Sequence, residues 1–530
     1  MPSTEFDVTV NPSDLAVDFR SLGGILFLSL VGILSLGWVT QEWGMGLSPD
    51  SASYISAARG LVKGLGLIQP PQGNLILPMF SYAPFFSIIL AGIGLGGIDP
   101  IQGARLLNIF MFGANIFLIG FVTHRYTQSR WVSWAGSFFA LTSLVMLELH
   151  AMVWSEAVFI FFGFLGLFLL TLFLDGRRNY LLFLFSSVAL GLAFLTKYSG
   201  VSFVAGGVLA TFLLSQRRFV RKIVDCLVLG SIGCFPMSLW VLRNHQVVGR
   251  PIELSWNFEP YVLGHVRQLF AYLSMWLLPA GVPDVARGVV LLVFLSALLG
   301  VSLICRKEIR TTLPWILLLS IASHIGTYFF TTAFMGEQPF DNRALSPVFV
   351  AGVVYLLLMC HASAGKSSRL TQMAVVLFLS VLAVSYLGRG VRWANQAKTE
   401  GLAYSGREWK TSGLLQRLKG LPPDVPIFSN GADALYLLLD KPALGIPGKE
   451  DVLKVHVPDR NRRLRKEYPA ELVKMKEELQ NHNGVLVYLN LIKRRWYLPS
   501  EEELRHNLPL RVVEKFSDGT IYKIGNEIGN

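Results

Sequence analysis

The sequence is poor in charged residues. Only 15% of its 530 residues are Asp, Glu, Lys or Arg, whereas 52% are hydrophobic. Soluble globular proteins carry about a quarter charged residues. The charges are also unevenly distributed: long stretches between residues 22 and 387 contain almost none, and the segment from Arg389 onward is rich in them. This composition excludes an ordinary soluble protein over most of the length and predicts an integral membrane protein.

Cysteine is scarce as well. The four cysteines lie within or at the edge of apolar segments, without the spacing of metal ligands. They are Cys226, Cys234, Cys305 and Cys360. The pattern excludes a disulfide framework and a cysteine-based zinc site, and indicates small buried side chains.

Thirteen apolar runs approach the roughly 20 residues that a membrane-spanning helix needs. The run 82–97 is rich in glycine and bounded by Pro84, and the run 269–282 is short and contains Pro279. Both are interpreted as helices that do not cross the membrane, so that eleven spans remain. They are 22–40, 104–123, 131–147, 157–174, 180–195, 200–214, 223–242, 289–304, 313–334, 344–360 and 373–387.

The net charge of +12 lies mostly in short loops between the spans and in the C-terminal segment. Because it is not gathered on one soluble face, no nucleic-acid partner is expected. Cytoplasmic loops of membrane proteins are enriched in Lys and Arg, so the most basic loops are assigned to the cytoplasm. These loops contain Arg125 and Arg130; Arg177 and Arg178; Arg217, Arg218, Arg221 and Lys222; Arg306, Lys307 and Arg310; and Lys366 and Arg369.

The number of crossings between these loops then fixes the topology. A multi-pass plasma-membrane protein is predicted, with a cytoplasmic N-terminus and an extracytoplasmic C-terminal domain. The membrane domain is assigned to residues 1–388 and the soluble domain to residues 389–530. The second domain is predicted to be a small α/β domain, because short apolar runs alternate with turn residues. Its expected strands are 426–429, 485–489, 512–516 and 520–524, and its expected helices are 432–439 and 470–479.

The topology brings ionisable residues of five outer loops to one face of the membrane. Asp50 lies in the first outer loop and Glu156 in the second, and they are followed by Lys197, Arg243 and Arg343. Ionisable residues at the membrane are costly and suggest function. A carboxylate can serve as a general base on a hydroxyl, and Lys and Arg can neutralise a departing phosphate. The pattern therefore fits group transfer from a lipid-linked phosphate.

Several short motifs in this part of the chain occur in a known order. The sequence resembles the GT-C class of membrane glycosyltransferases, and is most similar to protein O-mannosyltransferases and to the aminoarabinose transferases that act on lipid A. The resemblance covers residues 22–390. It rests on Asp50, Tyr54 and Ala57-Ala58-Arg59-Gly60; Tyr82-Ala83-Pro84; Gly103-Ala104-Arg105-Leu106-Leu107-Asn108; Trp154-Ser155-Glu156; Gly191 to Lys197; Arg243-Asn244 with Gly249-Arg250-Pro251; and Asn342-Arg343 to Pro347.

The resemblance implies an inverting hexosyl or pentosyl transfer from a polyprenyl-phosphate sugar to a hydroxyl group of a lipid, glycan or protein acceptor. Asp50 would be the catalytic base, and Glu156 would occupy the place of a second acidic residue. The other expected site residues are Lys197, Arg343, Arg105 and Arg243 for the donor phosphate, and Tyr54 and Tyr82 for contact with the substrate. No cofactor is required. The resemblance leaves a divalent cation open, but Ser51 stands where many relatives have a second acid, which argues against a metal site at Asp50.

Simpler interpretations remain for each residue. Asp50 could be a solvated loop residue or a helix N-cap, and Glu156 could only complement the dipole of the helix that it begins. Lys197 and Arg343 could extend towards the membrane interface without binding a ligand. For the whole protein, the alternative is a secondary transporter or lipid flippase without covalent chemistry, although its charges lie at one edge of the membrane and its halves show no repeat.

Overall fold

The structure is a computed structural model that describes residues 19–525, except 74, 178, 250–261, 307–310, 336–339, 365–367, 423, 451–464 and 494. Some predictions fall outside the described residues. These are the location of the N-terminal residues 1–18, the Arg250-Pro251 part of one motif, and the loop residues Arg178, Lys307, Arg310 and Lys366.

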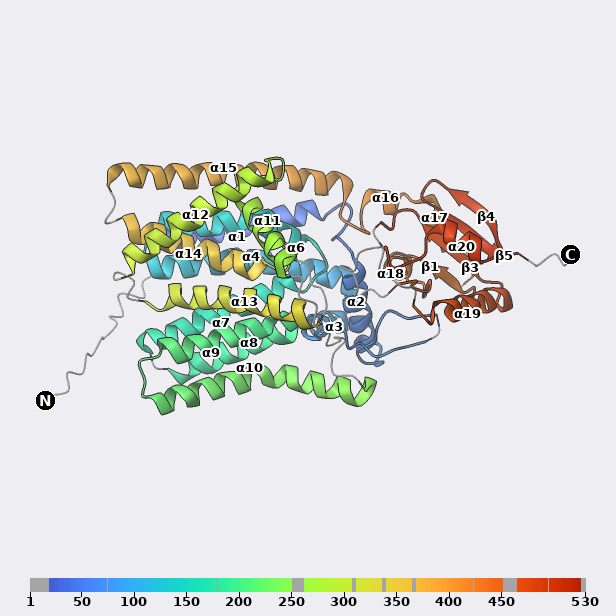
Figure 1. Ribbon diagram of the computed structural model, residues 1–530, viewed down its shortest axis with the longest axis horizontal. Coiled ribbons are helices and arrows are strands. Elements are labelled where there is room, and N and C mark those ends of the chain that lie inside the picture. Colours follow the sequence, from blue (N-terminus) through green and yellow to red (C-terminus); the bar gives the residue numbers. More distant parts are fainter. Residues whose placement is uncertain are drawn as a thin grey trace.

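The membrane domain is a bundle of long helices that run roughly along one direction (Figure 1). Eight of the described helices are long and apolar enough to cross a membrane. They are α1 (Phe19–Val39), α4 (Pro100–Thr127), α7 (Glu156–Leu172, in a span that continues to Gly176), α10 (Phe219–Val248), α12 (Asp284–Cys305), α13 (Leu313–Met335), α14 (Ser346–Ala364) and α15 (Arg369–Glu400). The chain is therefore a multi-pass membrane protein.

Three further predicted spans correspond to shorter helices. They are α8 (Tyr180–Thr196), α9 (Val201–Leu214) and the pair α5 (Arg130–Thr142) and α6 (Leu144–Ala151), which is bent by 53°. The run 131–147 was expected as one continuous helix. It breaks because Ser143 has an extended backbone (ψ 136°) and its hydroxyl accepts a hydrogen bond from the Met146 amide at 3.2 Å, which starts a new helix. The number of helices that cross the bilayer stays a prediction.

Three further helices of the membrane domain were not predicted to cross the membrane, and they too are shorter than a span. They are α2 (Pro49–Val62), α3 (Phe85–Leu95) and α11 (Val262–Leu277). Helix α3 lies within the run 82–97, and its 11 residues extend only about 16 Å, against a hydrocarbon thickness of about 30 Å. Helix α2 begins at Pro49, with Ser48 and Ser51 forming a reciprocal capping box. These caps fix the place of Asp50 in the first turn of α2.

Helix α15 approaches α5 closely at Gly390. A Cβ atom added to Gly390 would lie 2.7 Å from the backbone oxygen of Thr142, whereas one added to Gly388 would meet nothing within 4 Å. The substitution Gly390→Ala is therefore expected to destabilise the protein by about 1–3 kcal/mol, because backbone cannot move aside as a side chain can. Gly388→Ala in the same helix is the matched control and should be neutral or slightly stabilising. Thermal unfolding of the two purified variants in detergent compares them, and equal midpoints would contradict the expected close contact.

The C-terminal domain has the expected α/β composition. Its five-stranded sheet has the order β2-β1-β3-β5-β4, with parallel pairs β1–β2 and β1–β3 and antiparallel pairs β3–β5 and β4–β5. The strands are β1 (Ile427–Ser429), β2 (Leu444–Gly445), β3 (Val485–Leu489), β4 (Leu510–Phe516) and β5 (Gly519–Ile524). The helices are α16 (Arg407–Lys410), α17 (Gly413–Lys419), α18 (Ala432–Leu439), α19 (Tyr468–Asn481) and α20 (Glu501–Asn507).

Each strand and helix predicted for this domain is present within a few residues of its expected limits. The predicted domain boundary at residues 388 and 389 falls inside α15, which continues to Glu400. The reason is that charge appears in the sequence at Arg389, where the helix still continues for about three turns beyond its apolar part.

The C-terminal domain lies at one end of the bundle, next to α2 (Figure 1). The Arg59 guanidinium of α2 pairs with Asp440, which follows α18, at 2.9 Å and with Asp99 at 3.0 Å. The Tyr404 amide also donates to the Leu47 carbonyl at 3.0 Å. The segment just before Asp50 is thus bonded to the start of the C-terminal domain.

Candidate functional site

Four of the predicted site residues form one continuous chain of ion pairs. An Arg343 terminal nitrogen lies 2.7 Å from Asp50 Oδ2, and Arg343 Nε lies 2.8 Å from Glu156 Oε1. Lys197 Nζ lies 2.9 Å from the same Glu156 oxygen. The residues come from α2, the start of α7, the end of α8 and the turn before α14. Asp50 and Lys197 therefore lie at the same end of the bundle, and the prediction that they face the same side of the membrane stays a prediction.

The four side chains differ in their access to solvent. Glu156 is completely buried, whereas the side chains of Asp50, Arg343 and Lys197 are 24%, 26% and 21% exposed. Two cations share Oε1 of Glu156, and its Oε2 has no hydrogen-bond partner among the described residues. Because Glu156 is buried and its Oε1 contacts two cations, its catalytic role stays a prediction. Its geometry is that of an anchor that holds the two cations in place.

The position of Arg343 is fixed by its own turn and by an aromatic ring. Asp341 accepts a hydrogen bond from the Ala344 amide at 2.7 Å, which shapes the turn. The Arg343 guanidinium lies 3.9 Å from the centre of the Trp154 ring, a cation–π contact. The Trp154 indole donates to the Ser48 hydroxyl at 2.8 Å, and Ser48 is the N-cap of the helix that carries Asp50. Trp154 therefore connects the Arg343 side chain to the N-cap of the helix that carries Asp50.

The two predicted tyrosines have different roles. The Tyr82 hydroxyl donates to Asp50 Oδ1 at 2.8 Å. Tyr54 is buried and pairs instead with the Ser155 hydroxyl at 3.1 Å, while its ring packs edge-on against Tyr82 at 5.2 Å. Burial and the nearby carboxylates raise the pKa of both phenols, so both stay protonated. Tyr82 can therefore orient Asp50, and Tyr54 supports Tyr82.

Both cations of the cluster stay charged despite their surroundings. Burial alone would lower the pKa of Arg343 and of Lys197. For Arg343, the Glu156 and Asp50 carboxylates outweigh burial and raise that pKa. For Lys197, the charge of Glu156 and its hydrogen bond have the larger combined effect, and the pKa of Lys197 is also raised. With two carboxylates and two cations, the cluster carries no net charge.

The remaining two predicted phosphate ligands lie outside this cluster. Arg105 donates to the Gly37 carbonyl at 3.0 Å and to the Thr40 hydroxyl at 3.1 Å, so it caps the C-terminal end of α1. A phosphate-binding role for Arg105 therefore stays a prediction. Arg243 donates to the Met79 carbonyl at 2.6 Å, and its guanidinium lies 4.9 Å from the Trp240 ring centre. Met79 precedes Tyr82 by only three residues, so Arg243 is hydrogen-bonded to the loop that carries Tyr82.

Two contributors to the site were not assigned a role from the sequence. They are the ring of Trp154, which stacks on Arg343, and the side chain of Ser48, which caps α2. Trp154 precedes Glu156 in one of the shared motifs, and a serine ahead of Pro49 is a usual N-cap signal. Neither signal shows that the indole and the hydroxyl bond to each other.

The described residues contain no group of three or more His, Cys, Asp or Glu side chains arranged to hold a metal ion. Asp50 is instead occupied by Tyr82 and Arg343. A divalent cation at Asp50 stays a hypothesis.

The comparisons with known proteins agree with this architecture. ArnT from Cupriavidus metallidurans superposes with a TM-score of 0.61 over 95% of this chain and 98% of its own, at 14% sequence identity. The oligosaccharyltransferase AglB from Archaeoglobus fulgidus superposes with a TM-score of 0.52 over 96% of this chain and 75% of its own, at 10% identity. This is the GT-C fold.

The GT-C membrane domain also matches a sequence family. Residues 28–246 match the model of the dolichyl-phosphate-mannose-protein mannosyltransferases. The lipid A galacturonosyltransferase RgtD of Rhizobium johnstonii is 28% identical over 180 residues, which are 33% of this chain and 37% of the relative. The chain thus matches only about a third of that relative's length. The predicted resemblance to GT-C glycosyltransferases is confirmed.

Proposed function

We propose that this protein is an inverting glycosyltransferase that moves a sugar from a polyprenyl-phosphate donor to an acceptor hydroxyl at the end of the bundle that carries the C-terminal domain. The observation that carries the proposal is the chain of ion pairs from Asp50 through Arg343 and Glu156 to Lys197. It places a partly exposed carboxylate beside two cations, at one end of an apolar helical bundle. A base and a phosphate-binding group are what this transfer requires.

The relatives support the class of donor. ArnT has been solved with undecaprenyl phosphate and AglB with a dolichol-phosphate, and both share the fold of this chain. The matched family is named for a dolichyl-phosphate-mannose donor, and RgtD for lipid A as acceptor. A polyprenyl-phosphate sugar is therefore the proposed donor here, and a lipid, glycan or protein hydroxyl the proposed acceptor.

In the proposed reaction, the acceptor oxygen attacks the anomeric carbon from the side opposite to the phosphate. The new carbon–oxygen bond forms as the bond between the anomeric carbon and the phosphate oxygen breaks, and the phosphate leaves with the electron pair. Asp50 accepts the hydroxyl proton. Tyr82 donates to the other Asp50 oxygen and holds the carboxylate in orientation. Attack from the opposite face inverts the configuration of the sugar.

The charge balance indicates that the donor phosphate uses a third cation. Lys197 and Arg343 are already neutralised by Glu156 and Asp50, so a phosphate adds uncompensated negative charge. Arg243 has no acidic partner among the described residues and is hydrogen-bonded to the loop that carries Tyr82. It is the cation proposed to complete the phosphate site, together with Lys197 and Arg343.

The variant Arg243→Gln is expected to raise the KM for the donor roughly 10- to 100-fold, the effect of losing one charge-assisted hydrogen bond. Arg105→Gln is the matched control, because its guanidinium is occupied at the end of α1. Initial rates at varied donor concentration measure both values. A donor KM that rises equally in the two variants would contradict the separate placement of these arginines.

The proposal as a whole is tested with the purified full chain reconstituted in lipid vesicles. Radiolabelled polyprenyl-phosphate sugars are supplied together with a membrane-lipid extract as acceptor, and radioactivity is followed from donor to product. Turnover of at least one donor, with release of polyprenyl phosphate, is expected. A folded protein that moves labelled donor across a vesicle membrane without any turnover would instead support the transporter or flippase.

A further inference from the structure

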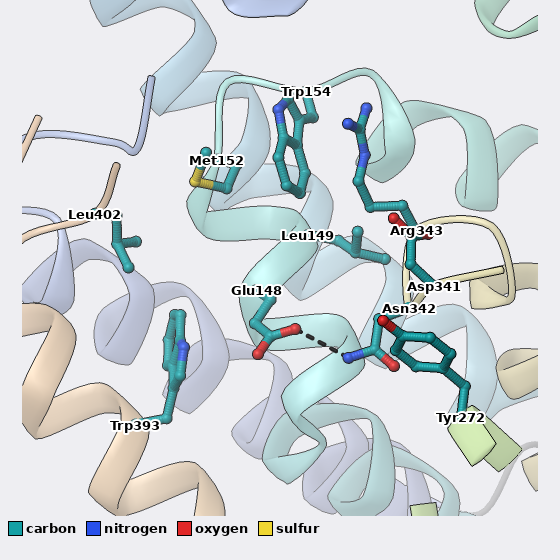
Figure 2. Close-up of a pocket in the computed structure, with 10 residues that line it drawn as sticks. All are labelled: Glu148, Leu149, Met152, Trp154, Tyr272, Asp341, Asn342, Arg343, Trp393 and Leu402. Carbon is teal, nitrogen blue, oxygen red and sulfur yellow. Dashed lines mark hydrogen bonds between the residues drawn. The ribbon is translucent and has the colours of Figure 1, made fainter. Parts of the chain in front are cut away.

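A cavity of about 390 Å³ adjoins the ion-pair cluster. Trp154 and Arg343 line it next to the cluster, and Trp393 of α15 lines it as well. Its size lies within the range of about 300–1,000 Å³ that small-molecule sites occupy. Figure 2 shows its lining side chains, which come from α6 and the loop after it, from α11, from α15 and the segment after it, and from the turn before α14. Those used below are Glu148, Tyr272, Asp341, Asn342, Trp393 and Trp154.

The cavity is lined by acidic groups. Glu148 and Asp341 are carboxylates. Arg343 is the one cation among the described residues that line the cavity, and it is already paired with Asp50 and Glu156. Glu148 Oε2 accepts a hydrogen bond from the Asn342 amide at 3.1 Å, and the described residues offer no partner to its second oxygen. Such a lining repels a phosphate or a sugar acid and provides acceptors for hydroxyl or ammonium donors.

The rest of the lining is aromatic. Tyr272, Trp393 and Trp154 contribute rings from three different elements. A few oriented polar groups within an aromatic wall are typical of small-molecule sites. A pyranose ring fits this combination, since its hydroxyls can donate to carboxylates while its C–H face packs on an aromatic ring. A purely apolar lipid tail would cover the second oxygen of Glu148 without giving it a hydrogen-bond partner, which is unfavourable.

The cavity also lies next to the proposed base. Trp154 lines it and stacks on Arg343 at 3.9 Å, and Arg343 pairs with Asp50 at 2.7 Å. One layer of side chains therefore separates an occupant of the cavity from Asp50. Leu402, at the start of the segment that leads to the C-terminal domain, closes another part of the wall.

We propose that this cavity binds a neutral or amine-bearing saccharide unit of the acceptor, with Glu148 as its hydrogen-bonding group and Trp393 as its stacking platform. The assignment to the acceptor rests on the proposed function. The carboxylates of Glu148 and Asp341 disfavour the donor phosphate inside the cavity, and the Arg343 guanidinium is paired with Asp50 and Glu156. The cavity would therefore favour acceptors whose bound saccharide unit carries no negative charge.

Binding is tested without any transfer reaction. The full chain in nanodiscs is titrated with methyl glucoside, glucosamine and galacturonate, and saturation-transfer NMR measures each affinity. Methyl glucoside and glucosamine are expected to bind, and galacturonate is expected to bind at least about 10-fold more weakly. The variants Glu148→Gln and Trp393→Ala should each weaken binding of the first two sugars about 10-fold.

Matched controls and overturning results are available for each variant. Trp131→Ala replaces an exposed tryptophan at the start of α5, and Glu502→Gln replaces an exposed glutamate of α20, and neither should change binding. Trp393→Phe keeps an aromatic ring and should retain binding if Trp393→Ala does not fold. The proposal is overturned if no sugar binds to the wild type, if galacturonate binds as well as methyl glucoside, or if Glu148→Gln binds like the wild type. Failure of donor turnover alone would overturn the proposed function and leave these binding results standing.

Discussion

Replacing Asp50 by asparagine is expected to reduce the rate of sugar transfer by about 10²- to 10⁴-fold, the usual contribution of a general base. Asparagine keeps the size of the side chain and can still accept the hydrogen bond from Tyr82. It cannot take a proton from the acceptor hydroxyl. Because Arg343 retains its contact with Glu156, the cluster and the fold should survive the change.

The measurement is the initial transfer rate at saturating donor and acceptor, with folding checked by thermal unfolding. Asp99→Asn is the matched control, since Asp99 is also a carboxylate at a helix start and pairs with an arginine, Arg59. It should retain most of the rate. A rate for Asp50→Asn within a factor of about three of the wild type would remove Asp50 as the base.

Much of the fold was predictable because the bilayer limits what the chain can do. Apolar runs of sufficient length gave the positions of the long helices, and the demotion of run 82–97 agrees with the shortness of α3. The bend at Ser143 was not predictable, because a serine inside an apolar run commonly stays helical and bonds to the preceding turn. That bend separates α6, which carries Glu148, from α5, and so the cavity was not visible in the sequence either.

The sequence predicted which residues form the site better than it predicted the ion pairs between them. Asp50, Glu156, Lys197 and Arg343 were assigned to one membrane face, and the structure joins them directly. The sequence does not show that Glu156 takes both cations on one buried oxygen, because pairing depends on how α7 and α8 pack. For the same reason Arg105 could not be distinguished from Arg343: its separate role follows from its contact with the end of α1.

The burial of Glu156 leads to a second large expected effect, on stability. Glu156→Gln leaves Lys197 without a carboxylate and Arg343 with Asp50 alone. Removal of one partner from a buried ion pair costs about 3–5 kcal/mol, because the remaining charge is left uncompensated in a low-dielectric environment. A loss of this size should lower the unfolding midpoint strongly, whereas Glu42→Gln, which removes a 54% exposed carboxylate 3.8 Å from Lys398, should change stability by less than about 1 kcal/mol.

The double variant Glu156→Gln with Lys197→Met separates the structural role of this pair from its role in the reaction. The second change removes the uncompensated cation, so the stability lost in Glu156→Gln should be partly recovered, with a coupling energy of about 0.5–3 kcal/mol in a double-mutant cycle. Sugar transfer should not recover, because Lys197 is proposed to bind the donor phosphate. Recovery of both properties would show that Lys197 serves only to neutralise Glu156, and additive losses of stability would show that the two side chains do not interact in the folded protein.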